Sequence, residues 1–144
     1  MDSKQPKYQY DLILLTDEDN LGFNPEEDQI ILALTKQSKS QLRIDRISWQ
    51  DPNFDWSRTK YVMFRSPWNY HYFFDQFMQW MEETSHKTTF INNPDIIKWN
   101  INKKYLLELN SKGIAIPNSV LVTLKDKEAY YESLQQQSQA NQDE

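Results

Sequence analysis

The residues best suited to chemistry begin at Arg65, which directly follows an apolar run at 61–64. A planar guanidinium binds a carboxylate or a phosphate through two parallel hydrogen bonds. An arginine at the mouth of a buried strand is also well placed to hold an anion in an open α/β sheet. We therefore interpret Arg65 as a candidate anion-binding residue. The alternative is a structural ion pair with one of the chain's many acids, for example Asp17 or Asp75.

Four neighbours extend this cluster, namely Ser66, Trp68, Asn69 and Tyr70. The serine, the asparagine and the tyrosine offer neutral hydrogen bonds, and the tryptophan can form a pocket wall. Each of them alone is more typical of an ordinary turn or of core packing. Together they predict a substrate-facing loop with more specificity than any single member.

Two other groups of charged side chains are weaker candidates. Asp17, Glu18 and Asp19 could bind a cation or an amine, but most short acidic loops are only solvated, and the spacing of a calcium-binding loop is absent. Lys103 and Lys104 come early in a predicted helix. A lysine there can reach a phosphate, although a solvated helix face is the usual explanation.

Residue counts exclude several chemistries. The 144 residues include no cysteine, two histidines and two glycines. Disulfides, thiolate catalysis, zinc sites rich in Cys or His, Walker loops and Rossmann glycine fingerprints cannot be built from this set. The net charge of −5 disfavours a nucleic-acid partner, which normally meets a basic face. We expect no signal peptide and no membrane span, and hence a cytoplasmic protein.

The hydrophobic pattern predicts the elements that would position these residues. Strands are predicted at 12–15, 42–44, 61–64, 89–91 and 120–122, and helices at 24–38, 71–85, 96–112 and 126–134. Asn24 and Glu27 are expected to form a capping box at the start of the first helix. Gly113 is expected to adopt the left-handed conformation that ends the third helix.

Strands that alternate with helices predict an α/β fold, with a mostly parallel open sheet and helices on both faces. Ligands in such sheets bind outside the carboxyl ends of the strands, which selects the loops at 16–23 and 65–70. We expect a flexible tail at 1–9, an α/β domain at 10–94, a helix and strand segment at 95–134, and a disordered tail at 135–144.

The order of several segments resembles the N-terminal part of ATP-grasp carboxylate–amine ligases of the prokaryotic glutathione-synthetase-like group. The resemblance covers about residues 10–122 and is carried by Trp49–Pro52 with Asp55–Trp56, Phe64–Tyr70, Phe77–Trp80, Asn93–Pro94, Lys98–Asn100, Asn102–Leu109 and Gly113–Pro117.

The resemblance implies a Rossmann-like pre-ATP-grasp domain at 10–94, which helps to bind the acid or amine substrate. The loop from Arg65 to Tyr70, together with Asp17, would face that substrate. Asn102-Lys103 looks like the family's Asp-Lys motif, so Lys103 is expected to contact an ATP phosphate. The segment at 95–134 would begin an ATP-grasp lobe that is incomplete.

The family's second ATP-contacting lysine, glycine-rich lid, adenine hinge and acidic Mg²⁺ ligands have no counterpart here. We therefore expect ATP and Mg²⁺ to act in a complete parent ligase, and expect neither to bind tightly to this chain alone. The chain would then be the substrate-binding part of an enzyme whose substrate is a small carboxylate or amine.

Two other readings remain. In one, the chain is a stand-alone interaction module that forms a homo-oligomer or binds the missing C-terminal ATP-grasp domain, through 96–112 and 119–124. In the other, it is an unrelated binder of a small ligand or of nucleic acid. The negative net charge of the chain disfavours the nucleic-acid partner.

Overall fold

The computed structural model describes residues 7–22, 24–38, 41–123 and 125–140. The chain divides into two compact units, one ending at Ile97 and the other beginning at Lys98. We describe each unit by itself. None of the helices in the described part of the chain has the length and apolarity that a bilayer crossing requires.

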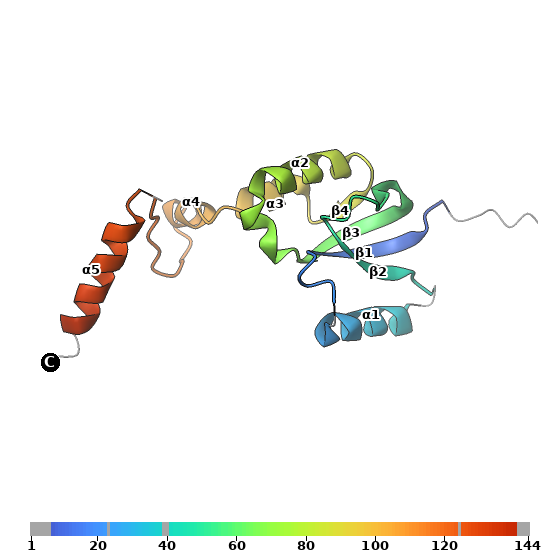
Figure 1. Ribbon diagram of the computed structural model, residues 1–144, viewed down its shortest axis with the longest axis horizontal. Helices are drawn as coiled ribbons and strands as arrows, with labels where there is room; N and C mark the ends of the chain where they lie inside the picture. Colours follow the sequence, from blue (N-terminus) through green and yellow to red (C-terminus); the bar gives the residue numbers. More distant parts are fainter. Residues whose placement is uncertain (1–6, 23, 39–40, 124, 141–144) are drawn as a thin grey trace, which may run out of the picture. The chain divides into compact units, whose positions relative to one another are not determined.

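The first unit is built on a four-stranded sheet in which every pair of neighbours is parallel (Figure 1). The strands are β1 (Tyr10–Thr16), β2 (Ile44–Ser48), β3 (Thr59–Ser66) and β4 (Thr89–Ile91), in the spatial order β2-β1-β3-β4. The central strand β1 is almost fully buried from Leu12 onward, as its continuous apolar run predicts. The parallel α/β fold predicted from the sequence is confirmed.

One helix lies on each side of this sheet in Figure 1, α1 (Pro25–Gln37) on one side and α2 (Phe74–Ser85) on the other. Two short 3₁₀ turns, η1 (Trp56–Arg58) and η2 (Trp68–Tyr72), lead into β3 and out of it. The predicted helix at 71–85 therefore begins later, at Phe74, because η2 takes the first residues. Leu42 lies outside β2, and β3 extends beyond the predicted 61–64 at both ends.

Aromatic rings form the core between α2 and the sheet. Phe77 and Met81 of α2 are 1% and 0% exposed. Ring centroids lie 5.1 Å apart for Trp49 and Phe77, and 5.0 Å apart for Phe64 and Phe90. Edge-to-face pairs of this kind add to the stabilisation that burial itself supplies. The predicted apolar face of α2 is thus partly core, but Phe73 and Phe74 at its start are about two-fifths exposed.

The start of α1 departs from the predicted capping box. The Asn24 side chain accepts a hydrogen bond from the Glu27 backbone N–H at 3.2 Å, as an N-cap should. The Glu27 carboxylate does not return this bond, because its oxygens point to other elements. Only the asparagine half of the box forms.

In the second unit, the single helix predicted over 96–112 is two short helices, α3 (Pro94–Asn100), which begins in the first unit, and α4 (Tyr105–Ser111). The Asn102 side chain accepts from the Lys104 backbone N–H at 3.0 Å, a local bond that competes with helical hydrogen bonding. Gly113 ends α4 with φ of 79°, and the next residue, Ile114, donates to the Leu109 carbonyl at 3.1 Å. The predicted glycine cap is confirmed as a Schellman motif.

The remaining segments differ from prediction in two places. Residues 120–122 form no strand, and Val120 is 68% exposed. The last helix, α5 (Lys127–Ala140), continues beyond its predicted end at 134, into the segment expected to be disordered. Residues 1–6 and 141–144 of the two predicted tails lie outside the described residues.

Candidate ligand site at the carboxyl edge of the sheet

The carboxyl edge of the sheet has a switch point between β1 and β3. The chain leaves β1 toward β2 on one side, and leaves β3 toward β4 on the other. Loops that diverge from adjacent parallel strands create the usual ligand position of open α/β sheets. The two loops selected from the sequence, at 16–23 and 65–70, are the loops that meet here.

Asp17 joins these two loops. It is 0% exposed, and its Oδ1 accepts from the backbone N–H and the side-chain amide of Asn20 at 2.9 and 2.7 Å. Its Oδ2 accepts from the backbone N–H of Asn69 at 2.8 Å. Both carboxylate oxygens are therefore used inside the protein, and this placement favours a structural role for Asp17 over contact with a ligand.

Asn69 is also fixed from both ends of its side chain. It is 7% exposed, its Oδ1 accepts from Trp49 Nε1 at 3.0 Å, and its Nδ2 donates to Gln50 Oε1 at 2.6 Å. Trp49 and Gln50 follow β2, so three strand ends contribute to one polar cluster. Sequence reasoning selected Asn69 but missed this support, whose signal was the polar Gln50 directly after a buried tryptophan.

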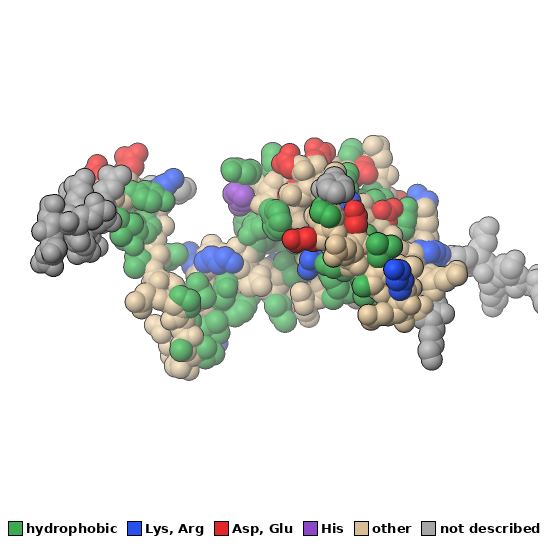
Figure 2. Space-filling model, turned by 90° about the horizontal axis from the view of Figure 1, so that it is seen from below, with side chains coloured by type: hydrophobic (Ala, Val, Ile, Leu, Met, Phe, Trp, Pro, Cys, Tyr) green, Lys and Arg blue, Asp and Glu red, His purple; other side chains and the backbone are tan. Residues whose placement is uncertain are grey.

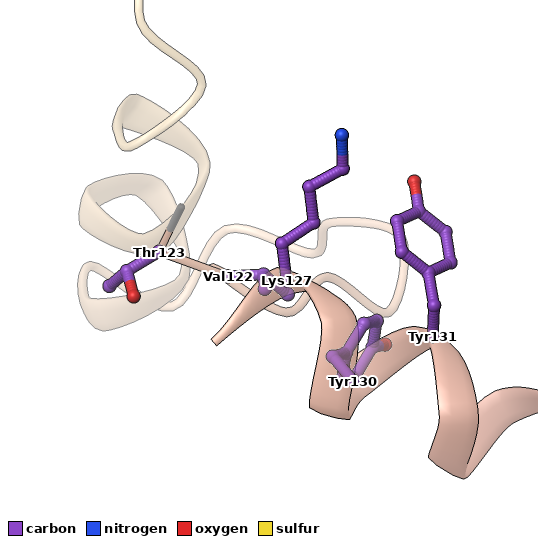
Figure 3. Close-up of a pocket in the computed structure, with 5 residues that line it drawn as sticks. All are labelled: Val122, Thr123, Lys127, Tyr130 and Tyr131. Atoms are coloured by element: carbon purple, nitrogen blue, oxygen red, sulfur yellow. The ribbon is translucent and has the colours of Figure 1, made fainter. Parts of the chain in front are cut away.

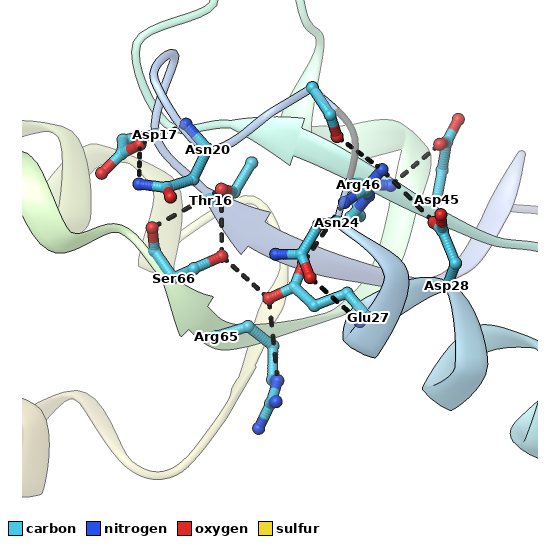
Figure 4. Close-up of polar contacts among 11 residues, drawn as sticks. Thr16, Asp17, Asn20, Asn24, Glu27, Asp28, Asp45, Arg46, Arg65 and Ser66 are labelled. Carbon is cyan, nitrogen blue, oxygen red and sulfur yellow. Dashed lines mark hydrogen bonds and ion pairs between the residues drawn. The ribbon is translucent and has the colours of Figure 1, made fainter.

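Ser66 connects β1, β3 and α1 (Figure 4). Its Oγ lies 3.0 Å from Thr16 Oγ1 and 2.8 Å from Glu27 Oε1. A serine has one hydroxyl proton, and the charged acceptor holds it more strongly. Ser66 therefore donates to Glu27, and the Thr16 hydroxyl can donate to Ser66. Ser66 is 1% exposed, which favours a supporting role.

Arg65 is the candidate that faces outward. Its side chain is 39% exposed, and its Nε lies 3.9 Å from Glu27 Oε1. The terminal nitrogens of Arg65 form no hydrogen bond with any residue in the described part of the chain, and Figure 4 shows them pointing away from Glu27. Its acidic neighbour is Glu27 and not Asp17 or Asp75, the two examples considered from the sequence.

The aromatic candidates follow Arg65 in the chain and differ in exposure. Trp68 is 63% exposed, whereas Tyr70 is partly buried with its ring 5.4 Å from that of Phe77. Tyr72 is 77% exposed on the same 3₁₀ turn. The segment after β3 thus combines a partly exposed guanidinium, at Arg65, with exposed aromatic rings a few residues later, residue types that suit a small anion with an apolar part.

Lys103 belongs to the second unit. Its ammonium lies 5.6 Å from the centre of the Tyr105 ring. A hollow of about 230 Å³ is lined by Lys103, Leu106, Leu107, Ser119, Val120 and Leu121. A second hollow of about 260 Å³ is lined by Val122, Thr123, Lys127, Tyr130 and Tyr131 (Figure 3).

A metal site is not apparent in the part of the chain that the structure describes, where no three Asp, Glu or His residues gather closely enough to hold an ion. The acidic residues of the first loop are used differently from one another. Asp17 is buried and fully hydrogen-bonded, while Glu18 and Asp19 are exposed. The described residues therefore do not fit a Mg²⁺ ion. Lys103 is exposed.

A sequence comparison and a structure comparison both find a DcsG protein similar to this chain. Cycloserine biosynthesis protein DcsG from Streptomyces lavendulae is 35% identical over 79 residues, which cover 54% of this chain and 26% of that protein. The crystal structure of D-cycloserine synthetase DcsG aligns with a TM-score of 0.64 and 28% identity, over 73% of this chain and 34% of that one. The chain thus spans about a quarter to a third of the length of these relatives.

The family match falls on the unit that carries the switch point. Residues 12–92 match the family described as D-cycloserine synthetase DcsG, N-terminal domain, and they include both loops and Arg65. These matches support the prediction that the parent protein is a synthetase. The glutathione-synthetase-like grouping stays a prediction. The chain belongs to the family of the N-terminal domain of the D-cycloserine synthetase DcsG.

Proposed function

We propose that this chain is the substrate-binding N-terminal part of an ATP-grasp ligase, and that Arg65 binds the carboxylate of a small amino-acid-like substrate. The observation that carries the proposal is the position of Arg65 together with the open terminal nitrogens of its side chain. Arg65 lies at the switch point of the sheet, and among the described residues it meets an acid only through Nε, at 3.9 Å, which keeps the fork of its terminal nitrogens open. The family relationship supports a synthetase as the parent.

The surrounding polar cluster would keep the loop rigid while Arg65 binds. Asp17 and Asn69 tie the loops after β1, β2 and β3 to each other with hydrogen bonds of 2.6 to 3.0 Å. Holding a site in its bound geometry reduces the entropy that a ligand must overcome. Trp68 would contact the apolar part of the substrate.

ATP and Mg²⁺ would belong to the complete parent. Lys103 is our candidate for one phosphate contact, because its ammonium is exposed in the turn before α4. Phosphoryl transfer also needs metal and cationic clamps around the phosphates. Because the described residues supply no such set, we assign this chain no step of that transfer and expect it to be inactive alone.

The test is a titration of the ¹⁵N-labelled chain with D-serine, followed by NMR at the Arg65 Nε–H signal. D-serine is a suitable probe because the similar protein is a D-cycloserine synthetase. D-serinamide, which lacks the carboxylate, is the matched control ligand. We expect a saturable shift with D-serine alone, and a loss of at least about tenfold in affinity for Arg65→Lys, because lysine cannot make the bidentate contact. Equal responses to both ligands would refute the carboxylate assignment.

A second candidate function is protein interaction. Large apolar side chains are exposed on both units, and Figure 2 shows hydrophobic side chains, in green, on several parts of the face that it views. The most exposed are Trp68, Tyr72, Val120 and Tyr131. Light scattering over a range of concentrations tests this function. A mass that rises with concentration would favour a homo-oligomer, and a constant monomer mass would count against self-association.

A further inference from the structure

Glu27 is the unusual residue of α1. It is the buried residue of that helix, with 3% of its surface exposed, while the apolar residues Ile30, Ile31 and Leu34 are only partly buried. Burying a carboxylate is unfavourable unless it is paired and hydrogen-bonded. The N-terminus of α1 is already capped by Asn24, so capping does not explain why an acid occupies this position.

Two consecutive residues at the end of β3 are the partners of one Glu27 carboxylate oxygen, and a β2 residue faces the other. Oε1 accepts from Ser66 Oγ at 2.8 Å and lies 3.9 Å from Arg65 Nε. Oε2 faces Arg46 Nη1 at 3.9 Å, and neither of these two buried atoms has a hydrogen-bond partner within the described residues. Glu27 therefore links α1 to the strand end from which the candidate substrate loop begins.

The two arginines depend on Glu27 to different degrees. The Arg46 side chain is 14% exposed, and its Nη2 also contacts Asp28 at 3.3 Å and the Gly22 carbonyl at 3.0 Å. Arg65 has Glu27 as its sole ion-pair partner among the described residues. Removing the charge of Glu27 would leave Arg46 in place but would release Arg65.

We propose that Glu27 is a positioning residue that holds Arg65 through Nε, with its terminal nitrogens directed toward a substrate carboxylate. This inference rests on the proposed function of Arg65. A long arginine side chain loses rotamer freedom when it binds a ligand, and a contact that restricts it beforehand reduces this loss. The Ser66 hydroxyl fixes Glu27 in turn, so the chain of contacts runs from the Ser66 side chain through Glu27 to Arg65.

The test compares Glu27→Gln with Asp28→Asn in D-serine titrations. Glutamine keeps the shape of Glu27 and can still accept the Ser66 hydrogen bond, but it loses the charge that holds Arg65. Asp28→Asn is the matched control, because Asp28 lies on the same helix and contacts Arg46 but not Arg65. We expect D-serine affinity to fall about fivefold to tenfold in Glu27→Gln and less than about twofold in Asp28→Asn.

The outcomes separate this inference from the proposed function. If Arg65→Ala leaves D-serine binding unchanged, the proposed function is wrong. If Arg65→Ala abolishes binding while Glu27→Gln and Asp28→Asn bind equally well, the positioning role alone is overturned. Thermal melts of all three variants show whether a change in affinity follows from a change in fold.

A measurement on the unmodified chain covers the case in which Glu27→Gln does not fold. The ¹⁵N heteronuclear NOE of the Arg65 Nε–H group reports how far the side chain is restricted on the nanosecond timescale. Arg58, which is exposed, provides the comparison within the same spectrum. We expect a clearly higher value for Arg65 than for Arg58, and equal values would overturn the proposal.

Discussion

Replacing Asp17 by asparagine tests whether the acidic loop is structural. In the native protein three donors share the Asp17 carboxylate, two from Asn20 and the backbone N–H of Asn69. An asparagine oriented to keep the Asn20 contacts would turn its own amide NH₂ toward the Asn69 N–H. One charge-assisted hydrogen bond would be lost, a buried donor would be left unsatisfied, and two bonds would become neutral.

The expected loss of stability follows from these contacts. A hydrogen bond to a charged group contributes about 1.5–3 kcal/mol, and an unsatisfied buried donor costs about 1–3 kcal/mol. The two terms overlap, so we expect Asp17→Asn to lower the free energy of unfolding by about 2–4 kcal/mol. With a urea m-value of about 2 kcal/mol per M, the middle of the range for small proteins, the midpoint should fall by about 1–2 M.

Urea unfolding followed by tryptophan fluorescence measures this change, because Trp49 contacts Asn69 directly. Asp19→Asn is the control, since Asp19 is in the same loop but exposed, and it should change stability by no more than about 0.5 kcal/mol. If the two variants unfold at the same urea concentration, the hypothesis that Asp17 has a structural role is refuted. Stabilisation of the native protein, but not of Asp17→Asn, by Mg²⁺ would instead support the cation-binding alternative.

Three further predictions concern stability. Phe77→Ala should cost about 3–5 kcal/mol, because Phe77 is 1% exposed in the aromatic core; a loss below about 1 kcal/mol in urea unfolding would contradict this packing. The side-chain hydrogen bond from Arg43 holds the pKa of Asp11 below its usual value, so its contribution is present above the unfolded-state pKa and is lost as pH falls through the lower folded-state pKa. Native protein should therefore lose more stability than Asp11→Asn in acid unfolding below about pH 4, and parallel curves would refute this. Gly113→Ala should weaken the end of α4 by about 1 kcal/mol, because φ is 79° there; amide hydrogen exchange at Ile114 measures the change, and unchanged protection would count against it.

The sheet and its switch point could be predicted because they depend on short-range patterns. A continuous apolar run such as 12–15 fits a strand covered on both faces, and helices between the strands imply parallel pairing. The ligand loops then follow from topology, without knowledge of any side-chain contact. Arg65 was identifiable for the same reason, since it directly follows a predicted strand.

Long-range polar contacts could not be predicted in the same way. The capping rule assigned Glu27 to the backbone three residues before it, yet its hydrogen bond joins Ser66, 39 residues away. The same limit applies to residues 120–122, because an apolar segment forms a strand only when another strand supplies its hydrogen bonds. The helix predicted over 96–112 failed for a local reason, the competing Asn102 side chain.

The two faces of the sheet carry different kinds of interaction, and this separates stability from function. On the α2 side, Phe77 and Met81 are buried among aromatic rings, where any lost volume leaves a cavity. On the α1 side, the apolar residues of the helix are only partly buried, and the Glu27 cluster links it to the edge that carries Arg65. Met81→Ala should therefore lower stability while the remaining folded protein binds D-serine normally. Glu27→Gln should do the reverse, with a larger effect on binding than on the melting temperature. If both variants changed binding and stability in the same proportion, the two faces would act as one cooperative structure and this division would be wrong.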